Sequence, residues 1–424
     1  MKIAIIGGGM AGLGAAYELA AGRQHEITVF EKSPTLGGLA ASVRVGGTPL
    51  EAFYHHLFPT YYDFLEIADT IGIRDAIFFR KAETAIFYGG RLYRFTSPTD
   101  LLRFAPLGMA DRLRTGAMLG RLKLSKRWHQ YEDIAAADWL RRHFGERAYA
   151  VLWRPLLESK FGAFAGRVSM AWFWGRIYER PSRFGYFDGG FKTITDALGR
   201  HLEKQGASIR TGTAVEAIQK TGGGFEVKTA EKSERFDQVI VAAPPIPFLN
   251  LSSPLLPPDF TERVRALKYL GTLSLILVLD RQLSPSYWLN INDRTQPFLA
   301  VVEQTNFVEP AAYGGKHVVY VGKYLDAEDA FYAKPDAELW QLCMAFLKNI
   351  NPAFEERWVL ERHLFRAPFT QPVIPVSYQK IRPGYRTPVA GLWWVSMSHI
   401  YPWDRGTDHS FHAGRELAAE LLGG

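Results

Sequence analysis

The sequence is poor in cysteine, because Cys343 is the only cysteine among its 424 residues. One cysteine cannot form an internal disulfide, and it cannot build a zinc or iron–sulfur site that needs several thiolates. We therefore expect a protein of the reducing cytoplasm, without a metal site.

Long apolar runs are also absent from the sequence. A membrane-spanning helix needs roughly 18 consecutive apolar residues, whereas the run 273–279 is long enough only for a buried strand. The N-terminal stretch has the charge and apolar character of a secretory signal, but its glycines at positions 7, 8, 9, 12 and 14 would interrupt the signal helix. The sequence therefore predicts neither a signal peptide nor a membrane span.

The bulk composition is that of a folded protein with many aromatic residues. Apolar residues make up 47%, charged residues 22% and aromatic residues 14% of the chain, and the aromatic share is high. The net charge of +7 suits an anionic ligand, an anionic membrane surface or nucleic acid. Because no nucleic-acid module accompanies this charge, we do not expect nucleic acid as a partner. The length favours two domains, or one domain with a large insertion.

A glycine-rich turn, Gly7-Gly8-Gly9-Met10-Ala11-Gly12, lies between a predicted strand at 2–6 and a predicted helix at 13–21. Gly7 permits the turn, Gly9 lets the backbone approach a pyrophosphate, and Gly12 allows close helix packing. A second predicted strand, 26–30, ends at Glu31, where a carboxylate can accept hydrogen bonds from ribose hydroxyls. This acid favours FAD or NAD over NADP.

A second glycine loop follows the acid and reads KSPTLGGLAAS over residues 32–42. With this loop the sequence resembles the flavoprotein group of flavin amine oxidases, protoporphyrinogen oxidase and phytoene-type desaturases, and more distantly UDP-galactopyranose mutase. In that group the loop wraps the FAD pyrophosphate, and bare amides at 37–40 can form an anion nest. The motifs and the resemblance predict cofactor contacts at Gly7, Gly9, Met10, Ala11, Gly12, Glu31, Lys32, Gly38, Leu39 and Ala40.

Two later segments extend the resemblance. Residues 187–245 run from FDGGF to VIVAAPP, and residues 391–395 read GLWWV before a C-terminal helix. The resemblance places Val215 against the adenine and Ala242 beside the cofactor. We also expect 225–229 to pair with 236–241 around the glycines at 222–224.

These blocks predict an α/β protein with a discontinuous, Rossmann-like FAD-binding domain and an α+β substrate domain that carries a helical insertion. The FAD-binding domain is predicted from segments 1–60, 185–245 and 385–424. The helical insertion is predicted at 61–184 and the sheet of the substrate domain at 246–384.

Adjacent histidines end the first block, at His55 and His56. In the mutase and its relatives a histidine-containing turn here approaches the isoalloxazine ring. Because neighbouring side chains of an extended segment point to opposite sides, at most one of the two faces the ring. We predict that His56 contacts the flavin and handles protons.

The segment HIYPWDRGTDHS, residues 399–410, joins the last predicted strand to the last helix. In the resembling proteins this junction lies against the ribityl chain and the N1–O2 edge of the flavin. We predict cofactor contacts from Asp404, Arg405, Gly406 and Thr407, with Arg405 also taking a catalytic role. Residues 411, 414, 417, 418 and 421 fall on one apolar face of the final helix.

Two inserted regions bear on the substrate. Residues 96–128 interleave seven Arg and Lys residues with apolar ones, which suits either peripheral membrane contact or a solvated helix packed on the substrate domain. Residues 153–180 are rich in Trp, Tyr and Arg, which suits either an apolar pocket with an arginine for an anionic head group or a Trp-rich core.

Taken together, these features predict a noncovalent FAD oxidoreductase that transfers a hydride between flavin N5 and a largely apolar small molecule, isoprenoid or porphyrin-like. A mutase-like isomerase acting on a sugar nucleotide is one alternative. A flavin amine oxidase is another, weakened because 271–275 reads GTLSL where that group usually carries a lysine. A flavin-bearing binding protein without turnover is the third. Cysteine attachment of the flavin is excluded at 396–399, SMSH, whereas attachment through His399 stays open.

Overall fold

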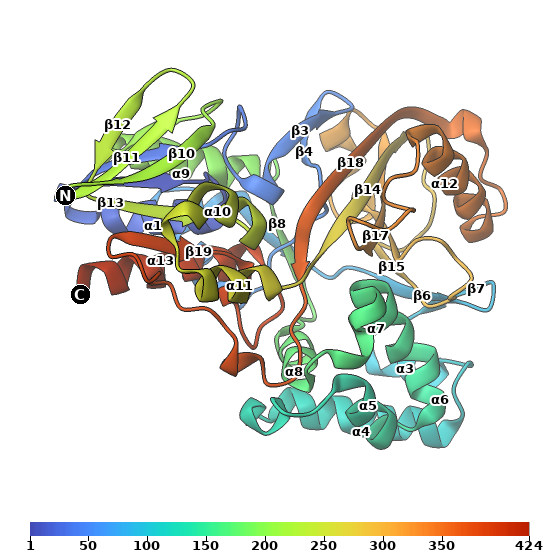
Figure 1. Ribbon diagram of the computed structural model, residues 1–424. Helices are drawn as coiled ribbons and strands as arrows, with labels where there is room; N and C mark the ends of the chain where they lie inside the picture. Colours follow the sequence, from blue (N-terminus) through green and yellow to red (C-terminus); the bar gives the residue numbers. More distant parts are fainter. Residues whose placement is uncertain (424) are drawn as a thin grey trace.

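The first sheet is a five-stranded parallel sheet in the computed structural model, which describes residues 1–423 (Figure 1). Its order is β19-β13-β1-β2-β9, with bounds β1 (Lys2–Ile6), β2 (Glu26–Phe30), β9 (Ser208–Arg210), β13 (Gln238–Ala242) and β19 (Leu392–Val395). The central strands are nearly continuous apolar runs because helices or a second layer cover both faces. The sheet draws its strands from segments 1–60, 185–245 and 385–424.

Different elements cover the two faces of this sheet. One face packs on α1 (Met10–Ala20), α9 (Lys192–Lys204) and α13 (Thr407–Gly423). The other packs on the three-stranded sheet β10 (Val215–Thr221), β11 (Gly224–Thr229) and β12 (Ser233–Phe236), and on α10 (Pro245–Ser252) and α11 (Pro258–Ala266). The predicted pairing of 225–229 with 236–241 is wrong, because β11 pairs with β10 and β12 while β13 enters the parallel sheet.

The second sheet has seven strands in the order β18-β14-β17-β16-β15-β6-β7. Their bounds are β6 (Thr84–Tyr88), β7 (Arg91–Arg94), β14 (Tyr269–Leu279), β15 (Trp288–Ile291), β16 (Ala300–Glu303), β17 (His317–Leu325) and β18 (Val359–Pro372). In β14, odd-numbered leucines 273–279 pack with α12 (Asp336–Ile350), whereas Ile276 and Val278 face the core of the first domain. One face of this sheet therefore packs with α12 on a core of its own, and the other face packs on the core of the first domain.

A helical part occupies the lower right of Figure 1. It comprises α3 (Pro98–Arg103), α4 (Met109–Leu124), α5 (Ala136–Phe144), α6 (Glu146–Ala148), α7 (Arg154–Phe161) and α8 (Met170–Glu179). Its core is rich in tryptophan, from Trp139, Trp153, Trp172 and Trp174. Segment 61–184 also supplies β6 and β7 to the second sheet, so it is not wholly helical. The proposed domain boundaries stay a prediction.

Short elements complete the described chain: β3 (Ser42–Val45), β4 (Thr48–Glu51), α2 (Tyr62–Thr70), β5 (Ile77–Arg80) and β8 (Phe184–Phe187). Within residues 1–423, none of the helices combines the length and apolar character that crossing a membrane requires. The architecture agrees with the α/β class predicted from the sequence.

The two ends of the chain meet where α1 and α13 cross. A Cβ added at Gly414 would lie 1.9 Å from the carbonyl oxygen of Ala11, and one added at Gly14 would lie 2.1 Å from that of Phe411. Backbone therefore packs directly on backbone, and neither glycine tolerates a side chain without separating the helices. The buried face of α13 contains the five predicted positions Phe411, Gly414, Leu417, Ala418 and Leu421.

We predict that Gly414→Ala lowers the free energy of unfolding by about 1–3 kcal/mol, because the new methyl group overlaps the Ala11 carbonyl. Gly120→Ala in α4 is the matched control, since its added Cβ meets nothing within 4 Å. That control should gain about 0.5–1 kcal/mol from the lower conformational entropy of the unfolded chain. Thermal unfolding of both variants measures the difference, and equal effects at the two sites would contradict the close crossing.

Candidate active site

The glycine-rich turn leaves backbone amides free at the start of α1. The helix begins after Gly9 with no side-chain cap, and its first backbone bond runs from Leu13 N to Gly9 O at 2.9 Å. Within residues 1–423, the amides of Met10, Ala11 and Gly12 have no protein acceptor. Such a helix start binds the pyrophosphate of a dinucleotide.

Glu31 ties the two glycine loops together. Its carboxylate accepts hydrogen bonds from Gly8 N at 2.7 Å and Ser33 N at 2.8 Å, and Gly37 N donates to Gly8 O at 2.8 Å. The predicted loops therefore lie side by side, as a shared pyrophosphate site requires.

The other predicted positions in this region differ in exposure. Ala40 is buried, Leu39 is half-buried and Lys32 is exposed. Val215 begins β10, and Ala242 ends β13 with its carbonyl against Gly7. Their contacts with the cofactor stay predictions.

His56 lies in a group of rings that we call the aromatic cluster: Tyr54, His56, Phe58, Phe184 and Trp288. The His56 ring centroid is 4.6 Å from that of Phe184, 5.3 Å from Phe58 and 5.8 Å from Trp288. Tyr54 meets Trp288 edge to face at 5.0 Å. Burial, helped by the nearby charge of Arg180, lowers the pKa of His56 to about 3, so the imidazole is neutral at physiological pH.

The two adjacent histidines have different environments. His55 Nδ1 lies 2.5 Å from Phe53 O, and its ring packs on Phe191. His56 Nδ1 is buried and has no hydrogen-bond partner within the described chain. His56 therefore offers a buried, unpartnered Nδ1 within the aromatic cluster, whereas the Nδ1 of His55 is engaged by Phe53 O.

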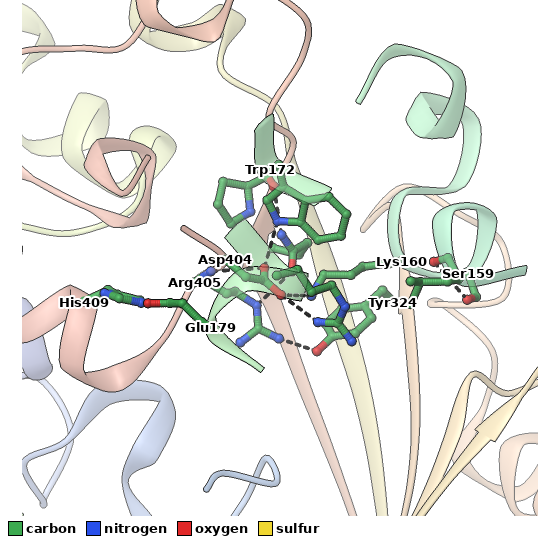
Figure 2. Close-up of polar contacts among 12 residues, drawn as sticks. Ser159, Lys160, Trp172, Glu179, Tyr324, Asp404, Arg405 and His409 are labelled. Atoms are coloured by element: carbon green, nitrogen blue, oxygen red, sulfur yellow. Dashed lines mark hydrogen bonds and ion pairs between the residues drawn. The ribbon is translucent and has the colours of Figure 1, made fainter. Parts of the chain in front are cut away.

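Asp404 is the centre of a buried charge group that the sequence did not reveal (Figure 2). Its Oδ2 lies 2.8 Å from both Lys160 Nζ and Arg176 Nη1, and its Oδ1 accepts from Trp172 Nε1 at 3.0 Å and Arg405 N at 3.1 Å. These five residues are the Asp404 cluster. No sequence signal marks the pairing of Asp404 with Lys160 and Arg176, because these residues of α7 and α8 lie 244 and 228 positions from Asp404 in the sequence.

Electrostatics keep Asp404 ionised. Burial opposes the charge, but Lys160, Arg176 and Arg405 hold the pKa of this carboxyl well below its usual range. Burial lowers the pKa of Lys160 to about 7, despite its contact with Asp404. Since the carboxylate is already engaged by four protein donors, its predicted bond to the ribityl chain stays a prediction.

Arg405 links the Asp404 cluster to the second sheet. Its Nε donates to Gln371 Oε1 at 3.0 Å, and its Nη2 donates to the Tyr324 hydroxyl. Tyr324 also lines a cavity of about 370 Å³ between α7 and the sheet, with Leu270 and Phe298 in its wall. The predicted catalytic arginine therefore lies between the C-terminal junction and this cavity.

The start of α13 supplies a second free polar atom. Thr407 Oγ1 is buried without a partner within residues 1–423, whereas Asp408 accepts a hydrogen bond from Phe64 N at 2.8 Å. Gly406 precedes them beside the Tyr61 hydroxyl. The free amides at α1, the His56 nitrogen and the Thr407 hydroxyl are polar groups left without protein partners, and a bound FAD would supply acceptors and donors for them.

Comparisons with known proteins agree with this geometry. The family described as "Flavin containing amine oxidoreductase" matches residues 10–422. A Mycobacterium tuberculosis protein named as a flavin-containing monoamine oxidase, AofH, is 26% identical over 99% of this chain and 96% of its own. The carotenoid phi-ring synthase of Streptomyces griseus is 24% identical over 91% of this chain and 80% of its own. A solved Exiguobacterium structure, named as a protoporphyrinogen oxidase, has a TM-score of 0.79 at 19% identity and covers 99% of this chain and 98% of its own.

Two buried aspartates four positions apart should differ strongly in the effect of substitution on the free energy of unfolding. Asp404→Asn leaves Lys160 and Arg176 without a counter-charge. It should lower the free energy of unfolding by about 3–5 kcal/mol at pH 8. Burial raises the pKa of Asp408 to about 7, which means that the fold does not favour its charged form. The free energy of unfolding of Asp408→Asn should therefore stay within about 1 kcal/mol of the wild-type value. Urea unfolding at pH 8 measures both values.

The pH dependence has opposite signs at these two sites. The folded pKa of Asp404 lies below its usual 3.8, so its stabilisation is present above that pH and is lost on acidification. The folded pKa of Asp408 lies above 3.8, so its contribution is lost as pH rises from about 4 to about 7. Parallel pH profiles of the two variants would contradict these assignments.

Proposed function

Because the chain belongs to the flavin containing amine oxidoreductases, we propose that it oxidises a largely apolar small molecule by hydride transfer to FAD. Family membership confirms three predictions: the resemblance, the FAD cofactor and the oxidoreductase class. The fold match confirms the Rossmann-like domain with a substrate domain. The proposal adds the nature of the substrate and the roles of individual residues.

The aromatic cluster is the observation that carries the proposal. Its rings come from the first block, from β8 and from β15, so it lies where the cofactor domain meets the second sheet. His56 adds no charge to it at physiological pH. Surroundings of this kind favour an apolar substrate and exclude water from a hydride transfer. The named activity of the carotenoid relative is also consistent with an apolar substrate.

The protein's own residues divide the work in this proposal. Bound FAD supplies a two-electron acceptor at N5. The aromatic cluster orients the substrate carbon. The free Nδ1 of His56 relays the proton that leaves with oxidation towards solvent, because a group with a pKa of about 3 does not keep a proton at physiological pH. Arg405 and the start of α13 provide positive potential beside the cofactor.

Noncovalent binding of FAD is part of the proposal. Cys343 is buried between the second sheet and α12, in a different core from the rings of the aromatic cluster. His399 is buried, with Nδ1 bonded to Ser396 N at 3.1 Å and Nε2 at 3.3 Å from Gly384 O. Both ring nitrogens are engaged, so neither is free for a bond to flavin.

An amine substrate is less well supported. In β14, positions 271–275 carry no lysine, and Ser274 is buried with its hydroxyl unpartnered among the described residues. Lys160 does approach the neighbouring strand, 5.7 Å from the Tyr324 ring, but it is paired with Asp404. No observation favours the isomerase.

Anaerobic mixing of the purified holoenzyme with candidate hydride donors tests the substrate class. We expect loss of the visible flavin absorbance with a porphyrinogen or a polyene, and none with a polyamine. Reduction by the polyamine alone would contradict the apolar assignment.

We predict that His56→Leu slows flavin reduction by at least about 100-fold while FAD stays bound, because the proton acceptor is lost. Since the folded pKa of His56 is about 3, the wild-type rate should show no inflection near the usual histidine pKa of 6.5. His55→Leu is the matched control and should keep at least a tenth of the rate, roughly. Stopped-flow absorbance gives both rates, and equal loss in the two variants would argue against a specific role for His56.

Peripheral membrane contact through 96–128 is a second, separate proposal. Exposed apolar side chains form a stripe along α3 and α4: Leu102, Met109, Leu113 and Leu124, which are 44%, 58%, 59% and 85% exposed. Exposed basic residues flank it, namely Arg103, Arg121, Lys126 and Arg127. An apolar stripe with a basic rim suits the surface of an anionic bilayer.

Three other basic residues of this region have structural roles instead. Arg112 donates to the carbonyls of Leu107 and Leu102, at 2.7 Å each. Arg114 donates to His143 O and Arg142 O, at 2.6 Å each, and Lys123 donates to the end of α8. Substituting these three residues would disturb the helical part and would not test membrane binding.

We predict that the double variant Met109→Ser, Leu113→Ser binds phosphatidylglycerol vesicles at least about tenfold more weakly than the wild type, because two apolar side chains no longer insert. Ile381→Ser is the control, since Ile381 is also 55% exposed but lies outside the helical part. Vesicle sedimentation measures binding. Equal binding of all three proteins would contradict membrane contact through α4.

A further inference from the structure

Positive charge exceeds negative charge around Asp404. Lys160, Arg176 and Arg405 surround this one carboxylate, and a fourth cation, Arg180, lies at the end of α8. The nearby carboxylate of Glu179 is already taken by His409, at 3.0 Å. Within residues 1–423, neither Arg180 nor Arg405 forms an ion pair with a carboxylate.

Arg180 is the least compensated of these cations. Its guanidinium lies over the Phe184 ring, 5.7 Å from the centroid, and its charge lowers the pKa of His56. Burial and the charge of Arg176 lower its own pKa to about 10. Holding a cation here without a partner costs free energy, which an arriving anion would offset.

The location of Arg180 indicates which anion would bind to it. The FAD pyrophosphate belongs at the start of α1, on the first sheet, whereas α8 belongs to the helical part with its own core. Arg180 is beside Phe184 and His56, and these are members of the aromatic cluster. An anion bound by Arg180 therefore lies next to the substrate, at the edge of an apolar surface.

We propose that Arg180, positioned beside Arg176, binds an acidic head group of the substrate, so that the substrate is an apolar molecule carrying a carboxylate or a phosphate. The planar guanidinium donates two parallel hydrogen bonds to either oxyanion. This inference rests on the proposed function, because it places the head group beside the same aromatic cluster. It opposes the expectation for an amine, whose cation Arg180 would repel.

Titration of the oxidised holoenzyme with four ligands of one chain length tests the inference. The ligands are decanoate, decyl phosphate, decanol and decylamine, and the perturbation of the visible flavin spectrum reports binding. We expect decanoate or decyl phosphate to bind about tenfold more tightly than decanol, and decylamine to bind most weakly. The stronger of the two anions identifies the head group as carboxylate or phosphate.

Variants locate the anion site. Arg180→Gln should remove the tenfold preference for the anion without weakening decanol, and Arg180→Lys should restore part of it. Arg183→Gln is the matched control, because Arg183 is exposed three positions further along and bonds to Phe79 O. It should keep the full preference for the anion.

Two results would overturn the inference. One is decanol binding as tightly as both anions, and the other is a preference for the anion that survives in Arg180→Gln. In that second case, a lowered flavin midpoint potential in Arg180→Gln would assign the charge of Arg180 to reduced flavin. Failure of decanol and both anions alike to bind would also overturn the apolar site of the proposed function, which separates the two claims.

Discussion

The ion pairs of Asp404 connect the three parts of the molecule on which the site depends. The carboxylate belongs to the junction between β19 and α13, while its partners Lys160 and Arg176 come from α7 and α8. The next residue, Arg405, reaches Gln371 and Tyr324 on the second sheet. Buried ion pairs add little net stability, but a broken one is costly. The cluster therefore specifies how the parts fit together more than it stabilises any one of them.

This arrangement separates two environments that lie close together. The Asp404 cluster is densely charged, whereas the aromatic cluster beside it contains a histidine that stays neutral. A cofactor bound between them would meet positive potential on one side and an apolar surface on the other. A charged side and an apolar side that are both in place before binding suit a reaction in which negative charge develops on the cofactor while water is excluded from the substrate.

Features set by local sequence could be predicted well. The turn at Gly7, Gly9 and Gly12 with Glu31, the parallel strands, and the apolar face of α13 follow from spacing and periodicity. The class of cofactor and enzyme was also predictable, because these motifs lie in the order typical of the family.

Features set by distant contacts could not be predicted. The side chains that bond to Asp404 are more than 200 residues away, and a single Asp or Lys carries no signal of its partner. The predicted pairing of 225–229 with 236–241 was wrong, because an apolar run as long as β13 fits either a hairpin or a parallel strand. The number of charges in 96–128 also does not reveal that Arg112, Arg114 and Lys123 donate hydrogen bonds to backbone carbonyls.

A crystal structure of the oxidised holoenzyme tests the central claim most directly, because it locates the isoalloxazine ring. The account predicts this ring between His56 of the aromatic cluster and residues 404–407, with the ion pairs of Asp404 intact. A ring bound elsewhere, with His56 Nδ1 and Thr407 Oγ1 still lacking partners, would contradict it.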